Sequence, residues 1–101
     1  MESVFLSTGQ YLGFINNGYL FSRDGKYLGW IESSFVWDVN GNFRGVLQII
    51  ENRKYIILNT LTIQPIPRVP RTSPVNPVLP NPPPNAPQIQ LPVGYKDGFS
   101  I

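Results

Sequence analysis

Short apolar runs separated by small polar turns fill the first two-thirds of the chain. The runs are rich in aromatic and β-branched residues, and pairs such as Asn17-Gly18 and Asn40-Gly41 separate them. Residues in such pairs tolerate the positive φ of tight hairpin turns. No window carries apolar residues at helical spacing with caps, so the pattern predicts a β meander. The expected strands span residues 3–7, 10–16, 19–23, 26–32, 35–39, 42–50, 53–58 and 61–64.

The runs also repeat with a period of sixteen residues. A fourth unit, roughly residues 51–63, keeps the apolar content but has Ile57 and Leu61 where the glycines should fall. A repeat of about 16 residues cannot bury its own apolar face, so four units are expected to close around a pseudo-fourfold axis. The predicted fold is all-β, with four sixteen-residue repeats closed around this axis. The three regular units are GQYLGFI from Gly9, GKYLGWI from Gly25 and GNFRGVL from Gly41.

Strand alternation predicts which side chains share a face. Tyr11, Gly13 and Ile15 are expected on one face and Leu12 and Phe14 on the other, with each Gly offering its neighbouring ring a flat surface. Both faces are then apolar in residues 10–16 and 26–32. The repeated aromatic residues are interpreted either as core or as the lining of a ligand site or interface. They are Tyr11, Phe14, Tyr27, Trp30, Trp37 and Phe43.

Proline marks a boundary in the chain. All 11 prolines lie between Pro65 and Pro92, while residues 1–64 hold 11 of the 13 aromatic residues. The chain therefore divides into a barrel domain at 1–64, an extended proline-rich segment at 65–92 and an aromatic C-terminal segment at 93–101.

The prolines partly keep a period of three, which places Pro74, Pro77, Pro80 and Pro83 on one edge of a polyproline II helix. Arg71, with Pro74 and Pro77, matches the basic-x-x-Pro-x-x-Pro spacing that aromatic grooves accept. The alternative is a semi-rigid spacer with a reach of about 90 Å.

The C-terminal segment returns to the composition of the barrel. Tyr95 and Phe99 flank an Asp-Gly turn. We expect these two rings to dock on a barrel, in their own chain or a neighbouring one; the alternative is a mobile terminus.

Composition limits the chemistry. The chain has no Cys and no His, which excludes a thiol nucleophile, an imidazole base, a Cys/His metal site and a disulfide framework. Asp24 and Asp38 read as turn formers rather than as an acid/base pair, so neither an enzyme nor a cofactor is expected. The net charge of +2 belongs to the tail and forms no basic stripe, which argues against nucleic acid. The N-terminus lacks the features of a secretory signal, and a cytoplasmic location is expected.

The repeats resemble those of the bacterial four-fold β-flower family. The resemblance covers residues 3 to about 64, and the proline-rich segment adds little to it. It implies a shallow barrel of four hairpin-like units, similar in outline to tubby-like and scramblase-type barrels but smaller and without their central helix; it implies no functional residues. It rests on Phe21-Ser22-Arg23-Asp24-Gly25, Leu28-Gly29-Trp30-Ile31 and Trp37-Asp38-Val39-Asn40-Gly41.

These features predict a non-catalytic binding or scaffold module whose aromatic-rich barrel holds an apolar ligand or partner. A domain of about 60 residues with two apolar faces needs further support, so a homo-oligomer is expected. The alternative function is peripheral membrane association through Phe14, Trp30 and Trp37, if these side chains are exposed.

Overall fold

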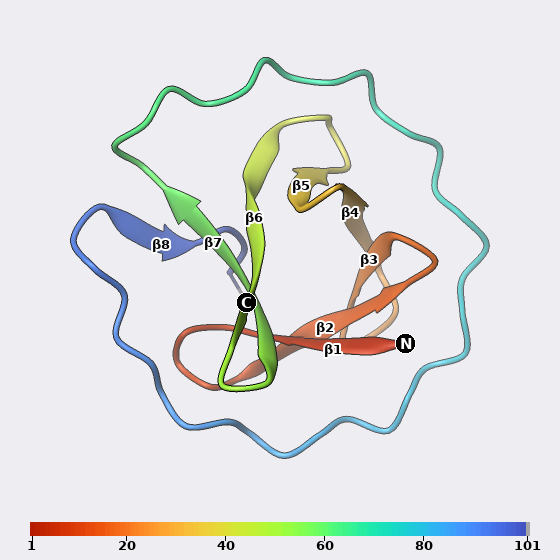
Figure 1. Cartoon of the computed structure of the whole chain (residues 1–101). Helices are drawn as coiled ribbons and strands as arrows, with labels where there is room; N and C mark the ends of the chain where they lie inside the picture. Colours follow the sequence, from red (N-terminus) through yellow and green to blue (C-terminus); the bar gives the residue numbers. More distant parts are fainter. Residues whose placement is uncertain (101) are drawn as a thin grey trace.

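The computed structural model describes residues 1–100, and within this part of the chain the secondary structure consists of strands without a helix. Figure 1 shows the strands grouped at the centre and a long extended segment around them. The strands are β1 (Glu2–Phe5), β2 (Tyr11–Asn16), β3 (Tyr19–Ser22), β4 (Tyr27–Glu32), β5 (Phe35–Asp38), β6 (Phe43–Ile50), β7 (Arg53–Asn59) and β8 (Tyr95–Asp97).

The sheet closes into a seven-stranded barrel at β7. Consecutive strands from β1 to β7 pair antiparallel, and β1 pairs parallel with the first half of β7 through Val4–Lys54 and Phe5–Tyr55. The second half of the same β7 edge pairs antiparallel with β8. Closure satisfies the backbone groups that an edge strand would leave free.

A one-residue bulge interrupts three of the strand pairs. On the first pair, Val4 lies opposite Gly13 while the next residue, Phe5, lies opposite Tyr11, which leaves one extra residue on β2. The same shift recurs between β3 and β4 and between β5 and β6. The extra residues fall sixteen positions apart and are Leu12, Leu28 and Arg44.

The bulges overturn the expected assignment of faces, because an extra residue reverses the alternation at that point. Tyr11 packs outside the barrel with Phe5, whereas Ile15 packs inside with Leu12. The expectation that Tyr11, Gly13 and Ile15 share one face is therefore wrong. Gly13 does not lie beneath the Tyr11 ring but opposite the interior residue Val4.

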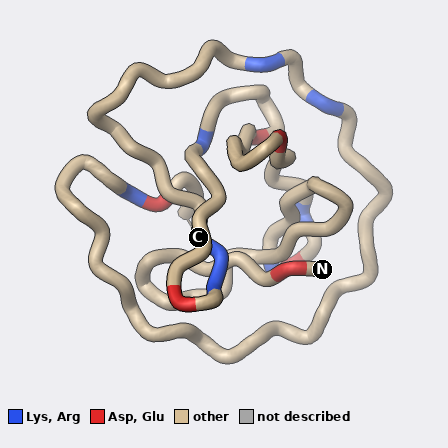
Figure 2. The backbone as a smooth tube through the Cα atoms, in the orientation of Figure 1, with Lys and Arg blue, Asp and Glu red and all other residues tan. Residues whose placement is uncertain are grey.

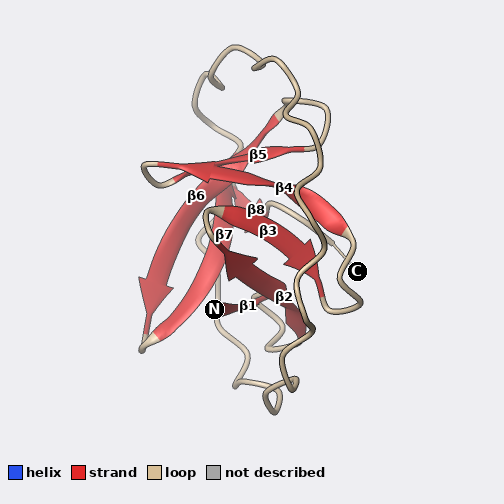
Figure 3. Cartoon of the chain, turned by 90° about the vertical axis from the view of Figure 1, so that its right-hand side faces the viewer, coloured by secondary structure: helices blue, strands red, loops and turns tan. Residues whose placement is uncertain are grey.

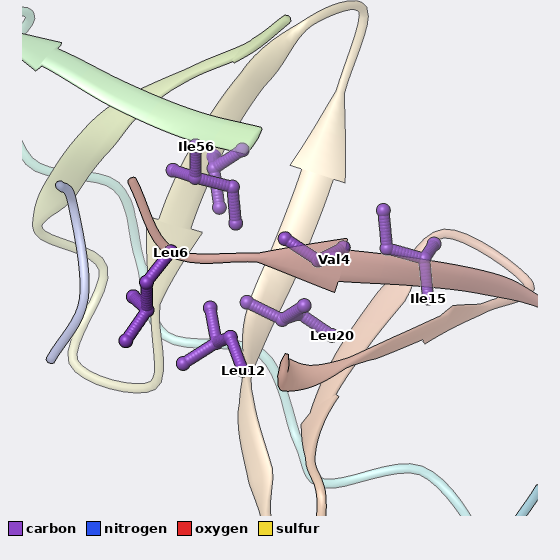
Figure 4. Packing of buried hydrophobic residues seen from close by; sticks show 7 residues of the cluster. Val4, Leu6, Leu12, Ile15, Leu20 and Ile56 are labelled. Atoms are coloured by element: carbon purple, nitrogen blue, oxygen red, sulfur yellow. The ribbon is translucent and has the colours of Figure 1, made fainter. Parts of the chain in front are cut away.

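Aliphatic side chains fill the barrel interior. Val4, Leu20 and Val36, one from each of three alternate strands, are fully buried at its centre. Figure 4 shows side chains from β1, β2, β3 and β7 converging on one another. Aliphatic side chains therefore occupy the centre of the barrel. The cluster also contains Leu6, Leu12, Ile15 and Ile56, with Leu28, Ile31, Leu47 and Phe99 packed against it.

The expected strand at residues 61–64 is wrong. The chain leaves the sheet at Asn59, whose side-chain oxygen accepts a hydrogen bond from the Leu61 N–H at 3.0 Å. Thr60 N–H donates to the Gly94 carbonyl at 2.7 Å, next to the β7–β8 pairing. The edge of β7 that a further strand would need is already occupied by β1 and β8.

Residues 65–91, here called the belt, circle the outside of the barrel (Figures 1 and 3). Every third residue from Pro74 to Ile89 is half-buried and the residues between them are exposed. A period of three is that of a polyproline II helix. The whole chain measures 37 × 34 × 21 Å, so the segment does not extend away as a spacer of about 90 Å would. The inward residues are Pro74, Pro77, Pro80, Pro83, Ala86 and Ile89.

The belt is fastened at the turns that open the sequence repeats, in reverse chain order. Arg68 N–H donates to the Gly41 carbonyl at 2.7 Å, and Ala86 N–H donates to the Gly9 carbonyl at 2.8 Å. Between these two points, Leu79 lies against Gly25. Each of these glycines permits the close approach because a Cβ atom there would meet the belt.

Candidate binding site

The predicted aromatic residues lie on the outer face of the barrel, and all of them except Trp30 belong to one of three groups of contacting rings. Phe14 stacks on Phe21 at a centroid distance of 5.4 Å, and Trp37 meets Phe43 at 5.3 Å. Phe14, Trp30 and Trp37 are each only 1% exposed. Membrane contact through these three residues would require them to be exposed, and they are buried. Tyr11, Tyr27 and Phe43 complete the predicted set, with Tyr27 and Phe43 half-buried.

Two arginines of the belt hold it against this face. The Arg71 guanidinium lies 5.0 Å from the Trp30 ring centroid, and its Nη2 is 2.6 Å from Glu32 Oε1. The Arg68 guanidinium lies 4.9 Å from the Trp37 ring centroid, and its Nη1 is 3.0 Å from Glu32 Oε2. Figure 2 shows that the basic residues of the belt fall in the stretch that passes β4 and β5. Pro74 and Pro77 follow on the inward edge.

Glu32 carries the negative charge with which both arginines of the belt pair. The hydrogen bond that Trp30 Nε1 donates to Glu32 Oε1, at 2.9 Å, is the main cause that lowers the pKa of this carboxyl. Desolvation is the next largest effect and raises the pKa, while Arg68 and Arg71 lower it further. Glu32 is therefore held in its charged form by one indole and two guanidinium groups.

The C-terminal segment contacts the barrel of its own chain on both faces. Phe99 packs against the interior cluster, and the Arg44 guanidinium lies 5.1 Å from its ring centroid. The Asp97 carboxylate accepts hydrogen bonds from the N–H and the hydroxyl of Ser7 at 2.9 and 2.7 Å. Tyr95 lies outside, where its hydroxyl accepts a hydrogen bond from the Asn59 amide at 3.3 Å.

One sector of the outer aromatic face is left open. A hollow of about 330 Å³, here called the first hollow, lies between β5, β6 and β7 and the residues that lead into the belt. Phe35, Phe43 and Tyr95 supply its rings. Its polar lining consists of neutral side chains, chiefly amides. The other lining residues are Val46, Gln48, Ile57, Asn59, Thr62, Ile63, Gln64 and Pro65.

A second hollow, of about 410 Å³, lies on the other side of Phe35. Trp37 and Arg68 line it, together with Glu32 and the Ser33-Ser34 turn. Phe35 borders both hollows and is 43% exposed. The Trp37 Nε1–H is buried and has no hydrogen-bond acceptor within residues 1–100. The arrangement suits non-covalent binding of an apolar group with hydrogen-bond acceptors.

Of the predicted site residues, the first hollow brings together Phe43 and Tyr95, and the second contains Trp37. Tyr11, Phe14, Tyr27 and Trp30 line neither. The sequence prediction missed Phe35, which stands at an aromatic position that recurs only once in the repeats, at Tyr19. Its exposure depends on where the belt leaves the barrel, and the sequence gives no local signal for that.

Comparison with known proteins assigns the chain to a family. Residues 1–91 match the family described as 4-fold beta flower protein. The chain belongs to this family. The match of this beta flower chain runs further than the expected residues 3 to about 64 and spans the belt as well. No curated protein and no solved structure matches the chain.

The beta flower assignment identifies the fold without naming a reacting group, so the candidate site rests on its geometry. None of the described residues forms a helix long and apolar enough to cross a membrane.

Within the site, the carboxylate of Glu32 is paired with two arginines. Elsewhere Asp38 Oδ1 accepts the N–H groups of Asn40 and Asn42, as a turn former does.

Proposed function

We propose that this beta flower chain is a non-catalytic binding module that accepts an uncharged, largely apolar group in the two hollows beside Phe35. One observation carries the proposal. The belt covers most of the outer aromatic face, yet Phe35 stays 43% exposed between two hollows. An exposed aromatic residue at the centre of a concave apolar surface is typical of binding sites.

The lining of the first hollow supports the class of ligand. Its volume of about 330 Å³ lies at the lower end of the range for ligand pockets. Gln48 offers an amide donor and acceptor beside the rings of Phe35 and Phe43. The Gln64 side-chain oxygen offers a further acceptor, since the Gln64 amide nitrogen donates to two backbone carbonyls of its own chain. A charged ligand would find no partner in this hollow, whereas an apolar group with a few hydrogen-bonding atoms would be satisfied.

The expectation of a homo-oligomer rested on an apolar outer face that needs a neighbour. The belt of the same chain supplies such a neighbour over most of that face. The sector around Phe35, which the belt leaves uncovered, would remain for a second copy of the chain to cover. The proposed binding function therefore does not depend on assembly.

Peripheral membrane association remains the second candidate, on different residues from those predicted. Val75 and Val78, three positions apart, are 93% and 84% exposed on the outward side of the belt, and Ile66 and Val69 are exposed in the same register. Such an aliphatic edge favours contact with lipid. Liposome co-sedimentation tests it: Val75→Ser with Val78→Ser should abolish binding, whereas Phe35→Ala should leave it unchanged.

N-phenyl-1-naphthylamine, an uncharged probe that fluoresces in apolar surroundings, tests the leading proposal on the full chain. We expect saturable enhancement with the native chain and about tenfold weaker binding in Phe35→Ala, because a central aromatic anchor is lost. Ile49→Ala is the matched control, since Ile49 is an exposed aliphatic residue of β6 that lines neither hollow. Equal binding by all three proteins, or no binding by the native chain, would refute the proposal.

A further inference from the structure

The outer aromatic face already holds one segment with polyproline character, the belt of its own chain. Arg71 lies over Trp30 and pairs with Glu32, and Pro74 and Pro77 follow at intervals of three on the inward edge. Aromatic surfaces with a nearby carboxylate bind basic, proline-rich segments in this way. The Arg71-x-x-Pro74-x-x-Pro77 spacing is thus engaged within the molecule.

The two hollows continue the same face beyond the belt. The Phe35 ring lies 5.2 Å from that of Phe43, which lies 5.3 Å from that of Trp37 beneath the belt residue Arg68. The series of rings therefore runs without a break from the covered sector into the open one. On both sides of Phe35 the hollows leave aromatic surface that the belt does not cover, with the belt residues Pro65 and Arg68 at their borders.

The two tryptophans of the face differ in one respect. Trp30 Nε1–H donates to Glu32, whereas Trp37 Nε1–H has no acceptor within residues 1–100 although Trp37 lines the second hollow. A buried donor without a partner is unfavourable and marks a position where an acceptor would bind. A polyproline II helix makes no internal hydrogen bonds, so its backbone carbonyls are free to accept.

We propose that the hollows beside Phe35 bind a second polyproline II segment, supplied by a proline-rich partner. Its prolines lie on either side of the Phe35 ring, and one of its carbonyls accepts a hydrogen bond from Trp37 Nε1. Arg68, whose side chain is 52% exposed over the Trp37 ring, swings aside to admit the carbonyl. This inference rests on the proposed function and specifies its ligand class.

The test uses the full chain labelled with ¹⁵N and an uncharged decaproline peptide, with a flexible (Gly-Ser)₅ peptide as the control. The chain has two tryptophans, so its spectrum contains two indole N–H signals, which Trp37→Phe assigns. We expect saturable binding that moves the Trp37 indole signal downfield and leaves the Trp30 signal in place. Phe35→Ala should weaken decaproline binding about tenfold, as the loss of a central aromatic anchor does, and Ile49→Ala should not.

Trp37→Phe separates a hydrogen bond from simple burial. It keeps a ring beneath Arg68 but removes the donor, so it should weaken binding of decaproline by a larger factor than binding of N-phenyl-1-naphthylamine, which accepts no such hydrogen bond. The inference is overturned if (Gly-Ser)₅ binds as well as decaproline, or if the Trp30 signal moves in place of that of Trp37. If the naphthylamine probe binds but decaproline neither binds nor displaces it, the inference fails and the proposed function stands. Failure of the naphthylamine probe itself would remove the proposed function.

Discussion

At Gly41 the belt passes so close to a turn of the barrel that no side chain fits between them. Gly41 has φ +83°, and a Cβ atom on it would meet the backbone carbonyl of Arg68. Gly18 in the β2–β3 turn has nearly the same φ, +80°, but a Cβ atom there would come no nearer than 3.9 Å to another residue. The two positions therefore separate the conformational role of a turn glycine from its role in holding the belt.

We expect Gly18→Ala to lower the free energy of unfolding by about 1 kcal/mol, the cost of a left-handed conformation for an L-residue. Gly41→Ala should lower it by about 1–3 kcal/mol more, because the belt must also move. Urea denaturation of both variants measures the difference. Equal losses would show that the belt does not press on this turn.

Glu32 makes belt attachment dependent on pH. Its folded-state pKa is lowered by Trp30, Arg68 and Arg71, so its contribution to stability is present above its unfolded pKa of about 4.3 and is lost as the pH falls through the lower folded value. Between pH 6 and pH 3, the native chain should lose more stability than Glu32→Gln does. Denaturation at each pH provides the measurement.

Asp24→Asn serves as the control for Glu32, because Asp24 is an exposed residue in the turn between β3 and β4. This variant should keep the pH dependence of the native chain. If Glu32→Gln kept it as well, the Glu32 contact would contribute nothing to stability in acid.

At the scale of elements, β8 and the residues after it contribute to the packing and hydrogen bonding of the barrel. Phe99 packs against the interior cluster, and Gly98 N–H donates to the Ile56 carbonyl at 2.9 Å. Phe99→Ala should therefore lower the free energy of unfolding by about 2–3 kcal/mol, as truncation of a half-buried ring does. Val93→Ala, at a side chain that is 94% exposed, should change it by less than about 0.5 kcal/mol. Similar values for the two variants in thermal unfolding would indicate a C-terminal segment that is free of the barrel.

The strands were predictable because their signals are local. Turn pairs with Gly and the short aromatic runs located seven strands to within one or two residues, and the family resemblance gave the barrel. The faces were not predictable, because a bulge at Leu12 is defined by the partner strand and leaves the local alternation of Tyr11 and Gly13 unchanged. For the same reason the strand after Asn59 was misplaced: the edge of β7 is completed by residues about forty positions later.

The candidate site was predictable only in its chemistry. The sequence indicates that aromatic rings and a basic-x-x-Pro-x-x-Pro segment are present, and both take part in one contact. It does not indicate that the two belong to each other, since contacts such as Arg71–Glu32 join residues far apart in the chain. Phe35 is exposed because the chain does not cover β5 and β6 until Arg68 lies over Trp37. That exposure depends on the course of the chain in space and not on any residue type.

At the scale of the whole molecule, the belt replaces the neighbour that a small two-faced barrel needs. A domain of about 60 residues buries only about 60% of the surface of its unfolded chain, and an outer face bearing Phe14, Trp30 and Trp37 adds to that deficit. Removal of residues 65–101 would uncover this face and also remove Phe99, which packs against the interior cluster. The shortened chain must then either pair with another copy through the same rings or lose its fold. Light scattering combined with circular dichroism distinguishes these states, and both agree with the expectation. A shortened chain that stayed folded, monomeric and as stable as the full one would show that the belt is dispensable, and that the outer rings need no cover.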